Sequence, residues 1–156
     1  MSWARIYGPD PAKEQMDRIL RWHSHLKKAA DTRADLVEIV DLALTVLLHC
    51  YHFKEWLVPG TGFNALPTCI QDAYSEVDLR LCQAVANGQK HFRLNNQTII
   101  DVDYMIVREW EPVGPPSLNI VYHFEGKSHH RSLLGLCNAC VSRLQSLKAE
   151  YENQLN

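Results

Sequence analysis

The order of apolar and polar positions predicts two long helices in the first third of the chain. Asp10-Pro11 is a typical helix start, and apolar residues then recur every three or four positions to about Ala30. From Arg33 to Leu57 the chain is apolar almost all round, until Pro59-Gly60 ends the pattern. We therefore expect a first amphipathic helix and a second, central helix that is largely buried.

The middle of the chain predicts one more helix and a pair of strands. Helical spacing resumes near Pro67 and ends around His91 or Leu94. Apolar and polar residues then alternate from Ile100 to Ile106 and again from Leu118 to Phe124, which is the period of a strand with one buried face. A turn-rich segment joins the two, so we expect a β-hairpin.

The last part of the chain carries the most regular amphipathic stripe, which predicts a fourth helix from just after Ser128 to nearly the C-terminus. The stripe consists of Leu133, Leu136, Cys137, Cys140, Val141, Leu144 and Leu147. Together these elements predict a mainly α fold, a four-helix bundle with a β-hairpin inserted between the third and fourth long helices. A length of 156 residues with 46% hydrophobic residues fits one domain over residues 1–156.

Charge and cysteine content narrow the function classes. A net charge of −2 gives no general basic field for duplex nucleic acid, so any nucleic-acid contact must be local. Five cysteines in irregular positions favour reduced thiols over a secreted disulfide framework. The N-terminal residues lack the apolar segment of a signal peptide, and the apolar run from Leu36 to Leu48 is shorter than the roughly 20 residues of a membrane span. We expect a cytoplasmic protein without a membrane partner.

Polar residues on the central helix form one narrow seam. They follow each other at steps of three or four, which places them on one face. The seam ends in a cluster of aromatic and ionisable side chains that includes Tyr51, Glu55 and Trp56. Two interpretations stay open: a narrow solvent-facing side of the helix, or a buried or interfacial polar site at its C-terminal end. The seam residues are Glu38, Asp41, Thr45, His49 and His52.

The segment from Ala86 to His91 is the strongest candidate for a functional motif. Asn87 and His91 are four residues apart and so share a face of the predicted third helix. Between them, Gly88 interrupts a helical run at a cost of about 1 kcal/mol relative to alanine. We expect something to offset this cost.

With these residues the chain resembles the HEPN superfamily, whose four-helix bundles dimerise and carry an arginine-x(4 to 6)-histidine motif, often Arg-Asn-x-x-x-His, near the end of the third helix. Asn87 and His91 match the asparagine and the histidine of that motif. The arginine is not matched, because Ala84, Val85 and Ala86 occupy the positions where it would stand. The resemblance therefore implies a HEPN-like domain with a degenerate motif.

The resemblance implies a homodimer that binds RNA or a nucleotide phosphate. It also implies a possible activity, metal-independent RNA cleavage in a defence or toxin-type system. In such an enzyme His91 would transfer a proton at the 2′-hydroxyl, beside Asn87. A second hypothesis is a non-catalytic module that uses the same bundle to hold a protein partner, with Asn87 and His91 at the helix end as structural residues. The residues expected to contact phosphate or RNA are Lys90, Arg93, Arg80, His52, Glu55 and Tyr51.

A basic cluster stands at the predicted start of the fourth helix, where backbone N–H groups favour anions. Its members are Lys127, His129, His130 and Arg131. Either a phosphate site or a solvated turn fits this cluster. His49 and His52 share a face as metal ligands do, but further ligands at metal-binding spacing are missing. We expect no metal site and no cofactor.

The central helix carries more apolar surface than one layer of neighbours covers, which predicts a homodimer. Consecutive helices of an antiparallel bundle place their C-terminal ends apart within one subunit. We therefore expect the dimer to join the ends of the central and third helices, bringing His52 and Glu55 toward Asn87 and His91.

Overall fold

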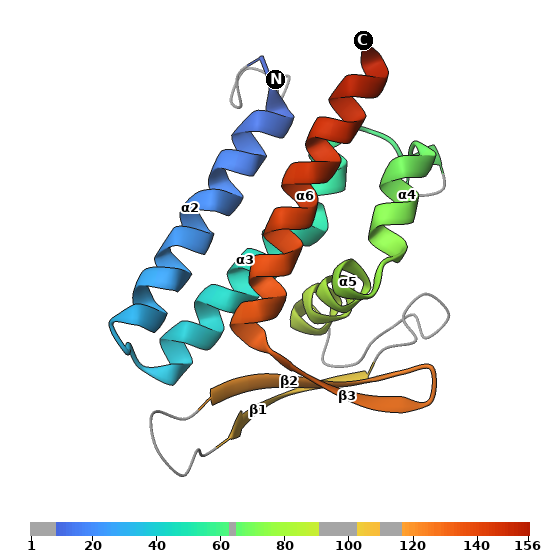
Figure 1. Cartoon of the computed structure of the whole chain (residues 1–156). Coiled ribbons are helices and arrows are strands. Elements are labelled where there is room, and N and C mark those ends of the chain that lie inside the picture. The colour runs from blue at the N-terminus through green and yellow to red at the C-terminus, as the bar shows by residue number, and fades with distance from the viewer. Residues whose placement is uncertain (1–8, 63–64, 91–102, 110–116) are drawn as a thin grey trace.

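The structure, a computed structural model, describes residues 9–62, 65–90, 103–109 and 117–156. In this part of the chain, five helices pack around a common core, and a three-stranded antiparallel sheet lies across one end of them (Figure 1). The elements are α2 (Pro11–Asp31), α3 (Leu36–Leu57), α4 (Thr68–Ser75), α5 (Val77–Lys90), β1 (Asp103–Glu109), β2 (Ser117–Phe124), β3 (Lys127–Ser132) and α6 (Leu133–Leu155). The prediction of a mainly α fold is confirmed.

α2 and α3 lie side by side and are joined by a short connection (Figure 1). Asp10 caps α2 by accepting a hydrogen bond at 3.0 Å from a backbone N–H in the first turn, with Pro11 at the first helical position, as the sequence predicts. α3 begins at Leu36 and not at Arg33, because Arg33 takes a left-handed φ of 53° and Asp35 caps the helix. The central helix is therefore shorter at its start than the apolar pattern predicts.

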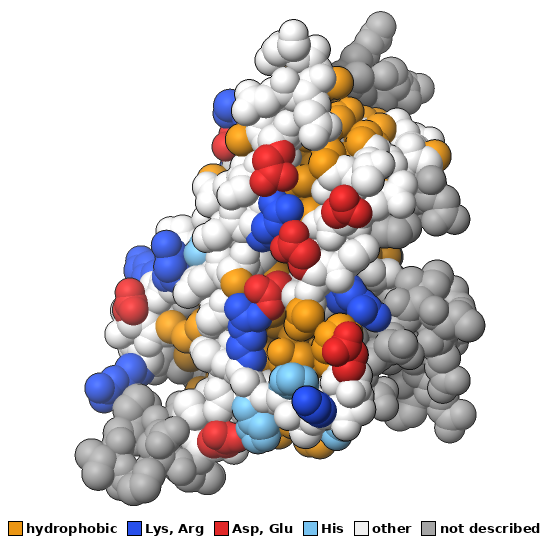
Figure 2. Space-filling view, turned by 45° about the vertical axis from the view of Figure 1, so that its right-hand side comes forward, with side chains coloured by type: hydrophobic (Ala, Val, Ile, Leu, Met, Phe, Trp, Pro, Cys, Tyr) orange, Lys and Arg blue, Asp and Glu red, His pale blue; other side chains and the backbone are white. Residues whose placement is uncertain are grey.

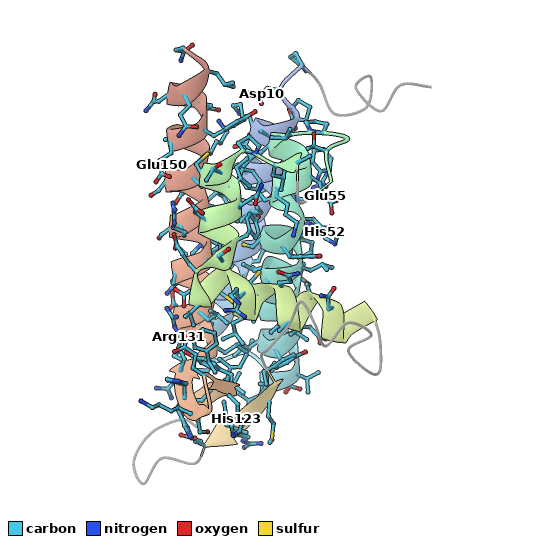
Figure 3. All side chains as sticks on the ribbon, turned by 90° about the vertical axis from the view of Figure 1, so that its right-hand side faces the viewer. Asp10, His52, Glu55, His123, Arg131 and Glu150 are labelled. Atoms are coloured by element: carbon cyan, nitrogen blue, oxygen red, sulfur yellow. The ribbon has the colours of Figure 1, made fainter. Side chains whose placement is uncertain are left out.

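The predicted third helix is two helices, α4 and α5, which meet at Glu76. The backbone of Glu76 is extended, with φ −66° and ψ 147°, and this interrupts the helical hydrogen bonds. Its carboxylate accepts from Arg143 Nε, 3.0 Å from both oxygens, which ties the break to α6. The break lets α4 pack beside α6 while α5 crosses α3 (Figure 3). The prediction of one continuous helix is therefore wrong over residues 68–90, and residues 91–102 lie outside the described part.

The sheet has the order β1-β2-β3, one strand more than the sequence predicts. β2 pairs with both neighbours, so that Ile120 lies opposite Ile106 on one side and Arg131 on the other. Between β2 and β3, Glu125 and Gly126 take positive φ values of 50° and 75°, as a two-residue type I′ turn requires. That turn folds β3 back along β2, so the predicted helix start in this segment is wrong and α6 begins only after it.

The core between α3, α5 and α6 contains four of the cysteines. All seven apolar positions of the α6 stripe are buried, which confirms that prediction. Cys82 donates a hydrogen bond to the Leu47 carbonyl at 2.9 Å, and the thiol of Cys137 donates to the Ala43 carbonyl at 3.7 Å. Burial raises the pKa of the Cys50, Cys82 and Cys137 thiols, so they stay protonated and serve packing.

α3 is the one described helix whose length and composition would allow a membrane span, a test that buried core helices pass as well. Its residues Ala43, Val46 and Leu47 are fully buried among the other elements. The helix is therefore buried along one side only, with eight of its 22 residues buried, and the prediction of a largely buried central helix is wrong in this respect.

Candidate functional site

The predicted motif lies at the end of α5, at the limit of the described residues. Asn87 is half-buried on α5 and Lys90 is the last residue of that helix, whereas His91 and Arg93 lie outside the described part of the chain. Within the described residues, Asn87 forms no hydrogen bond with the residues of α3 that were expected to meet it. Their meeting across a dimer stays a prediction.

A tyrosine on β1 accounts for the glycine in the motif. A Cβ atom at Gly88 would lie 2.3 Å from Oη of Tyr104, far inside contact distance. Gly88 therefore makes room for the phenol group, which is half-buried and whose pKa is raised by burial. The contact brings a hydroxyl group beside the turn of α5 that carries Asn87. The alternation pattern places Tyr104 on a strand but gives no reason to connect it with Gly88.

Tyr51, His52 and Glu55 form a local group on the outer side of α3. His52 Nδ1 lies 3.1 Å from Glu55 Oε1, and the ring of Tyr51 contacts the imidazole edge-on with centroids 4.9 Å apart. Figure 3 shows His52 and Glu55 on the side of α3 away from α6, toward which the end of α5 also projects. The predicted residues of α3 thus lie together and face outward.

Lys54 lies beside this group but points inward. It is 7% exposed, and its Nζ lies 3.8 Å from the ring centroid of Tyr51 and 4.8 Å from that of Tyr74. Burial lowers its pKa to about 8, partly opposed by the charge of Glu55. The two rings provide a cation–π environment for the ammonium group.

A second group, not predicted from the sequence, lies where α2 packs beside α3. Gln15 is 1% exposed; its Nε2 lies 3.3 Å from His49 Nδ1, and its Oε1 accepts from Arg18 Nη1 at 3.2 Å. Trp22 stacks on His49 with ring centroids 6.4 Å apart and planes inclined by 15°. The guanidinium carbon of Arg18 lies 5.7 Å from the ring centroid of Trp56. One buried amide thus positions an imidazole and a guanidinium beside two indole rings.

These side chains continue along the α2 and α3 surface as a row of four rings and one guanidinium group, which we call the α2–α3 ribbon. Trp22 also contacts His25, with centroids 5.9 Å apart, and is 36% exposed. A hollow of about 470 Å³ begins at these two rings and is lined further on by Lys28 and Glu38. Burial, followed by the charges of Arg18 and His52, lowers the pKa of His49, so its imidazole is neutral at neutral pH. The ribbon consists of Arg18, Trp22, His25, His49 and Trp56.

The interpretation of the polar seam as a solvent-facing side holds at the start of α3, and that of an interfacial polar site at its C-terminal end stays a hypothesis. Glu38 and Asp41 face solvent, whereas His49 is half-buried against α2. The matching signal on α2 is the spacing of Arg18, Trp22 and His25 at steps of four and three, which places them on one face. Only the packing of α2 on α3 shows that these two faces meet.

The basic cluster lies on β3 and not at the start of a helix, so its predicted position is wrong. Alternation along the strand sends Lys127, His129 and Arg131 to one face and His130 to the other. Arg131 forms an ion pair with Asp78 of α5, which ties the sheet to the helices. The cluster is therefore divided between two faces of the sheet.

Arg80, a residue expected to contact phosphate, lies over β2. Its guanidinium carbon is 5.0 Å from the ring centroid of Phe124. It stands on the same helix as Asn87, seven residues earlier, and is half-buried. The structure thus brings it to the side chains of the β2–β3 hairpin.

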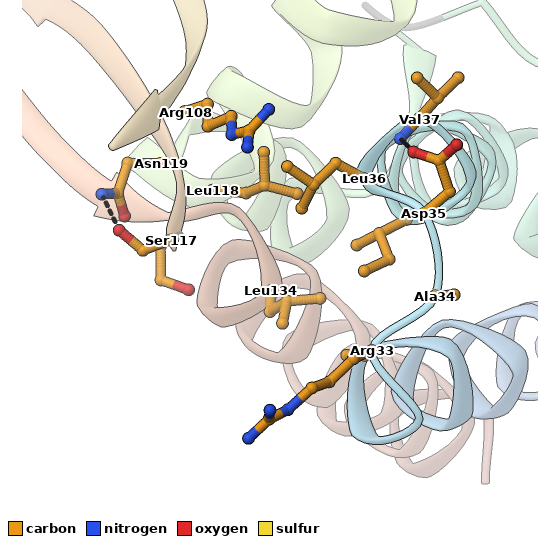
Figure 4. A pocket seen from close by; sticks show the side chains of 13 residues that line it. Arg33, Ala34, Asp35, Leu36, Val37, Arg108, Ser117, Leu118, Asn119 and Leu134 are labelled. Atoms are coloured by element: carbon orange, nitrogen blue, oxygen red, sulfur yellow. Dashed lines mark hydrogen bonds between the residues drawn. The ribbon is translucent and has the colours of Figure 1, made fainter. Parts of the chain in front are cut away.

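A cavity of about 630 Å³ separates the α2–α3 connection from the sheet (Figure 4). Arg33 and Arg108 lie at its border, and Leu36 and Leu118 contribute apolar walls. In Figure 4, Arg108 extends past Leu118 toward the start of α3, where Asp35 accepts a hydrogen bond from a backbone N–H at 3.2 Å. None of the predicted site residues that the structure describes lines this cavity.

Within the described residues, no group of three or more histidine, cysteine, aspartate or glutamate side chains is arranged to hold a metal ion. The ribbon and the hairpin instead combine aromatic rings with cationic side chains. Comparison of the chain with family models, with curated proteins and with solved structures gives no match.

Proposed function

We propose that this protein binds single-stranded RNA on the α2–α3 ribbon, as a HEPN-like homodimer. The observation that carries the proposal is the stacking of Trp22 on His49, with His49 and Arg18 both held by the buried amide of Gln15. Unpaired RNA bases stack on aromatic side chains, and nearby basic groups bind the phosphates. Because 36% of Trp22 is exposed, a base can reach its ring.

The helices support the HEPN-like part of the proposal. In it, α2, α3, the broken pair of α4 and α5, and α6 correspond to the four helices of a bundle. The sheet, with β1 and β2 as its hairpin, is an insertion before the last helix. The protonated thiols of the core suit a protein that works in the cytoplasm.

RNA cleavage is the catalytic form of this proposal, with Asn87 and His91 as the reacting pair. His91 takes the proton of a 2′-hydroxyl, whose oxygen attacks the adjacent phosphorus. The 5′-oxygen of the next nucleotide leaves and takes a proton from water, which yields a 2′,3′-cyclic phosphate without a metal ion. Because the arginine of the motif is absent, Lys90 and Arg93 stabilise the charge on the phosphate.

The test is incubation of the purified protein with labelled single-stranded RNA in EDTA. We expect cleavage by the wild type, loss of cleavage with His91→Ala at unchanged RNA affinity, and weaker binding with Trp22→Ala. If the RNA binds but stays intact, the ribonuclease hypothesis is wrong and the hypothesis of an RNA-binding protein remains. Absence of RNA binding by the folded wild type would contradict the proposal.

α3 favours a second candidate function, a module that holds a protein partner. Val37 is 66% exposed, and Val40, Leu44, Leu48 and Tyr51 follow it at steps of three or four along a half-buried face. Such an apolar stripe suits a helix of another chain, which in the homodimer is a second copy. Light scattering tests the homodimer, because a monomer of 17.9 kDa at micromolar concentration contradicts it.

A further inference from the structure

The cavity of about 630 Å³ between the α2–α3 connection and the sheet is a separate place from the α2–α3 ribbon, and we call it the connection cavity. Residues of α2, α3, β1, β2 and α6 border it, together with the connection itself. Its volume lies in the middle of the range of small-ligand sites, roughly 300 to 1,000 Å³. The connection cavity is therefore large enough for one small molecule.

Backbone geometry holds two walls of the connection cavity in place. In the connection, Arg33 takes a left-handed φ of 53°, and the N–H group of Ala34 donates to the carbonyl of Ala29 at 2.9 Å. On the other side, Ser132 caps α6 by accepting a hydrogen bond from the Gly135 N–H at 3.1 Å. Both walls are thus formed before a ligand arrives, which lowers the cost of binding one.

The lining of the connection cavity is mostly apolar. Leu36 of α3, Leu118 of β2 and Leu134 of α6 are half-buried and lie around it (Figure 4). The polar side chains at the start of β2 pair with each other, since Asn119 Nδ2 donates to Ser117 Oγ at 3.2 Å. The cavity therefore offers mainly hydrocarbon contacts, which favours a ligand with an apolar body.

The charged residues of the lining are two arginines and one aspartate. Arg33 and Arg108 both border the cavity. Asp35 borders it as well, but its carboxylate accepts a hydrogen bond at 3.2 Å from the Val37 N–H, at the positive end of α3. Within the part of the chain that the structure describes, Arg33 forms no salt bridge. The charge of the lining therefore favours an anionic group on the ligand.

The charges on the face of the molecule in Figure 2 are arranged differently. Acidic and basic side chains are interspersed there over the helices. Arg143 of α6 pairs with Glu76 and with Glu150. Lys148, further along α6, pairs with Glu152. These cations are neutralised by their neighbours, whereas the connection cavity combines apolar walls with an arginine that has no salt bridge among the described residues.

We propose that the connection cavity binds a medium-chain fatty acid. The hydrocarbon chain lies against Leu36, Leu118 and Leu134, and the carboxylate pairs with Arg33. Arg108 adds a second positive charge on the β1 side. No residue of the α2–α3 ribbon lines the cavity, so the proposal does not depend on RNA binding.

Calorimetric titration of the full chain with decanoate, below its micelle concentration, tests the proposal. Acetate and decylamine are separate titrants, because acetate lacks the chain and decylamine carries the opposite charge. We expect decanoate to bind about a hundredfold more tightly than acetate, since burial of the chain contributes most of the binding free energy. It should bind about tenfold more tightly than decylamine, which the two arginines repel.

Variants of the cavity border sharpen the test. Arg33→Gln should weaken decanoate binding about fivefold, because the carboxylate loses its charged partner. Ala30→Leu places a larger side chain at the α2 border of the cavity and should weaken binding about tenfold. Leucine is a good helix former, so this variant should fold. Arg21→Gln is the matched control, because Arg21 is exposed on α2 outside the cavity, and it should bind decanoate like the wild type.

Three outcomes would overturn the proposal: no saturable decanoate binding by the wild type up to about 10 mM, equal decanoate affinity in the wild type, Arg33→Gln and Ala30→Leu, or decylamine binding as tightly as decanoate. Binding of a peptide with an apolar C-terminal residue, without binding of decanoate, would also overturn it and assign the cavity to a protein partner. If decanoate binds as expected and single-stranded RNA does not bind, the proposed function is wrong and the fatty-acid site stands.

Discussion

The polar groups on the two sides of α3 differ in how far they are enclosed by the fold. Toward α5 and α6, the carbonyl groups of Ala43 and Leu47 accept hydrogen bonds from the buried thiols of Cys137 and Cys82. Toward α2, the imidazole of His49 contacts the buried amide of Gln15 and a partly exposed indole. The first side encloses its polar groups completely, and the second side fixes them at the surface.

Because of this difference, substitutions on the first side should affect stability, and substitutions on the second side should affect ligand binding. A buried side chain on the first side has no contact with solvent, so we expect its replacement to change stability and not direct ligand contacts. A ring on the second side can lose its ligand contact while the fold remains. Each of the following experiments compares a change on one side with a change on the other.

The largest expected effect is on the enclosed side. Phe53→Ala removes a side chain with 0% exposure and should lower the free energy of unfolding by about 3–5 kcal/mol. Urea denaturation measures the change. Trp22→Ala is the comparison on the open side and should cost no more than about 1 kcal/mol. Equal losses of stability for the two variants would contradict the division between the sides.

Lys54 is an ionisable residue enclosed on the first side of α3, and its replacement tests how much this burial costs. The Lys54→Met variant should be more stable than the wild type at pH 7 by about 1–3 kcal/mol, because burial lowers the lysine pKa from 10.5 to about 8 and the cation–π contacts offset part of that cost.

The pH dependence of this effect has a fixed sign. Between pH 8 and 10.5 the unfolded chain still holds the Lys54 proton that the folded chain has released, so wild-type stability rises with pH relative to Lys54→Met. Denaturation curves of both proteins at pH 7 and near pH 10 measure this. An advantage of Lys54→Met that stays constant or grows with pH would show that the folded-state pKa is not lowered.

Gln15→Leu should cost about 1–2 kcal/mol of stability, because it leaves polar atoms of His49 and Arg18 without their amide partner. RNA affinity should fall as well, since both side chains lose their fixed positions. Thermal denaturation and a filter-binding assay measure the two effects. Lower stability with unchanged RNA affinity would show that Gln15 is a packing residue only.

A smaller effect is expected where α5 meets β1. Gly88→Ala places a methyl group against the Tyr104 hydroxyl and should cost about 1 kcal/mol, after the gain in helix propensity is subtracted. In a Tyr104→Phe background the cost should be smaller, because the closest atom is removed. A double-mutant cycle by urea denaturation measures this coupling. Strictly additive effects would mean that the hydroxyl does not explain the glycine.

Elements with a strong local period could be predicted from the sequence. The stripe of α6 repeats over the whole helix, and all its apolar positions are buried. The break at Glu76 could not be predicted, because α4 and α5 continue one helical pattern and the contact with Arg143 comes from a distant segment. β3 was missed because its residues are polar and show no alternation of hydrophobicity; the Glu125-Gly126 turn was the available signal.

The candidate site, like the fold, could be predicted from the sequence only in part. The pattern on α3 identifies His49 and the group around His52, and a single helix suffices for this. The ribbon needs the pairing of α2 with α3, which joins residues 34 positions apart, as in the contact of Gln15 with His49. A sequence pattern on either helix alone does not show which neighbour it faces.

RNA affinity of ribbon variants is the most direct test of the central claim, that the open side of α3 and α2 is a base-stacking surface. Fluorescence anisotropy with a labelled single-stranded RNA should show about tenfold weaker binding for Trp22→Ala and for Arg18→Ala, with the fold intact by circular dichroism. His130→Ala, an exposed histidine on the outer face of the sheet, should bind like the wild type. Equal affinity of the wild type, Trp22→Ala and Arg18→Ala would contradict the claim.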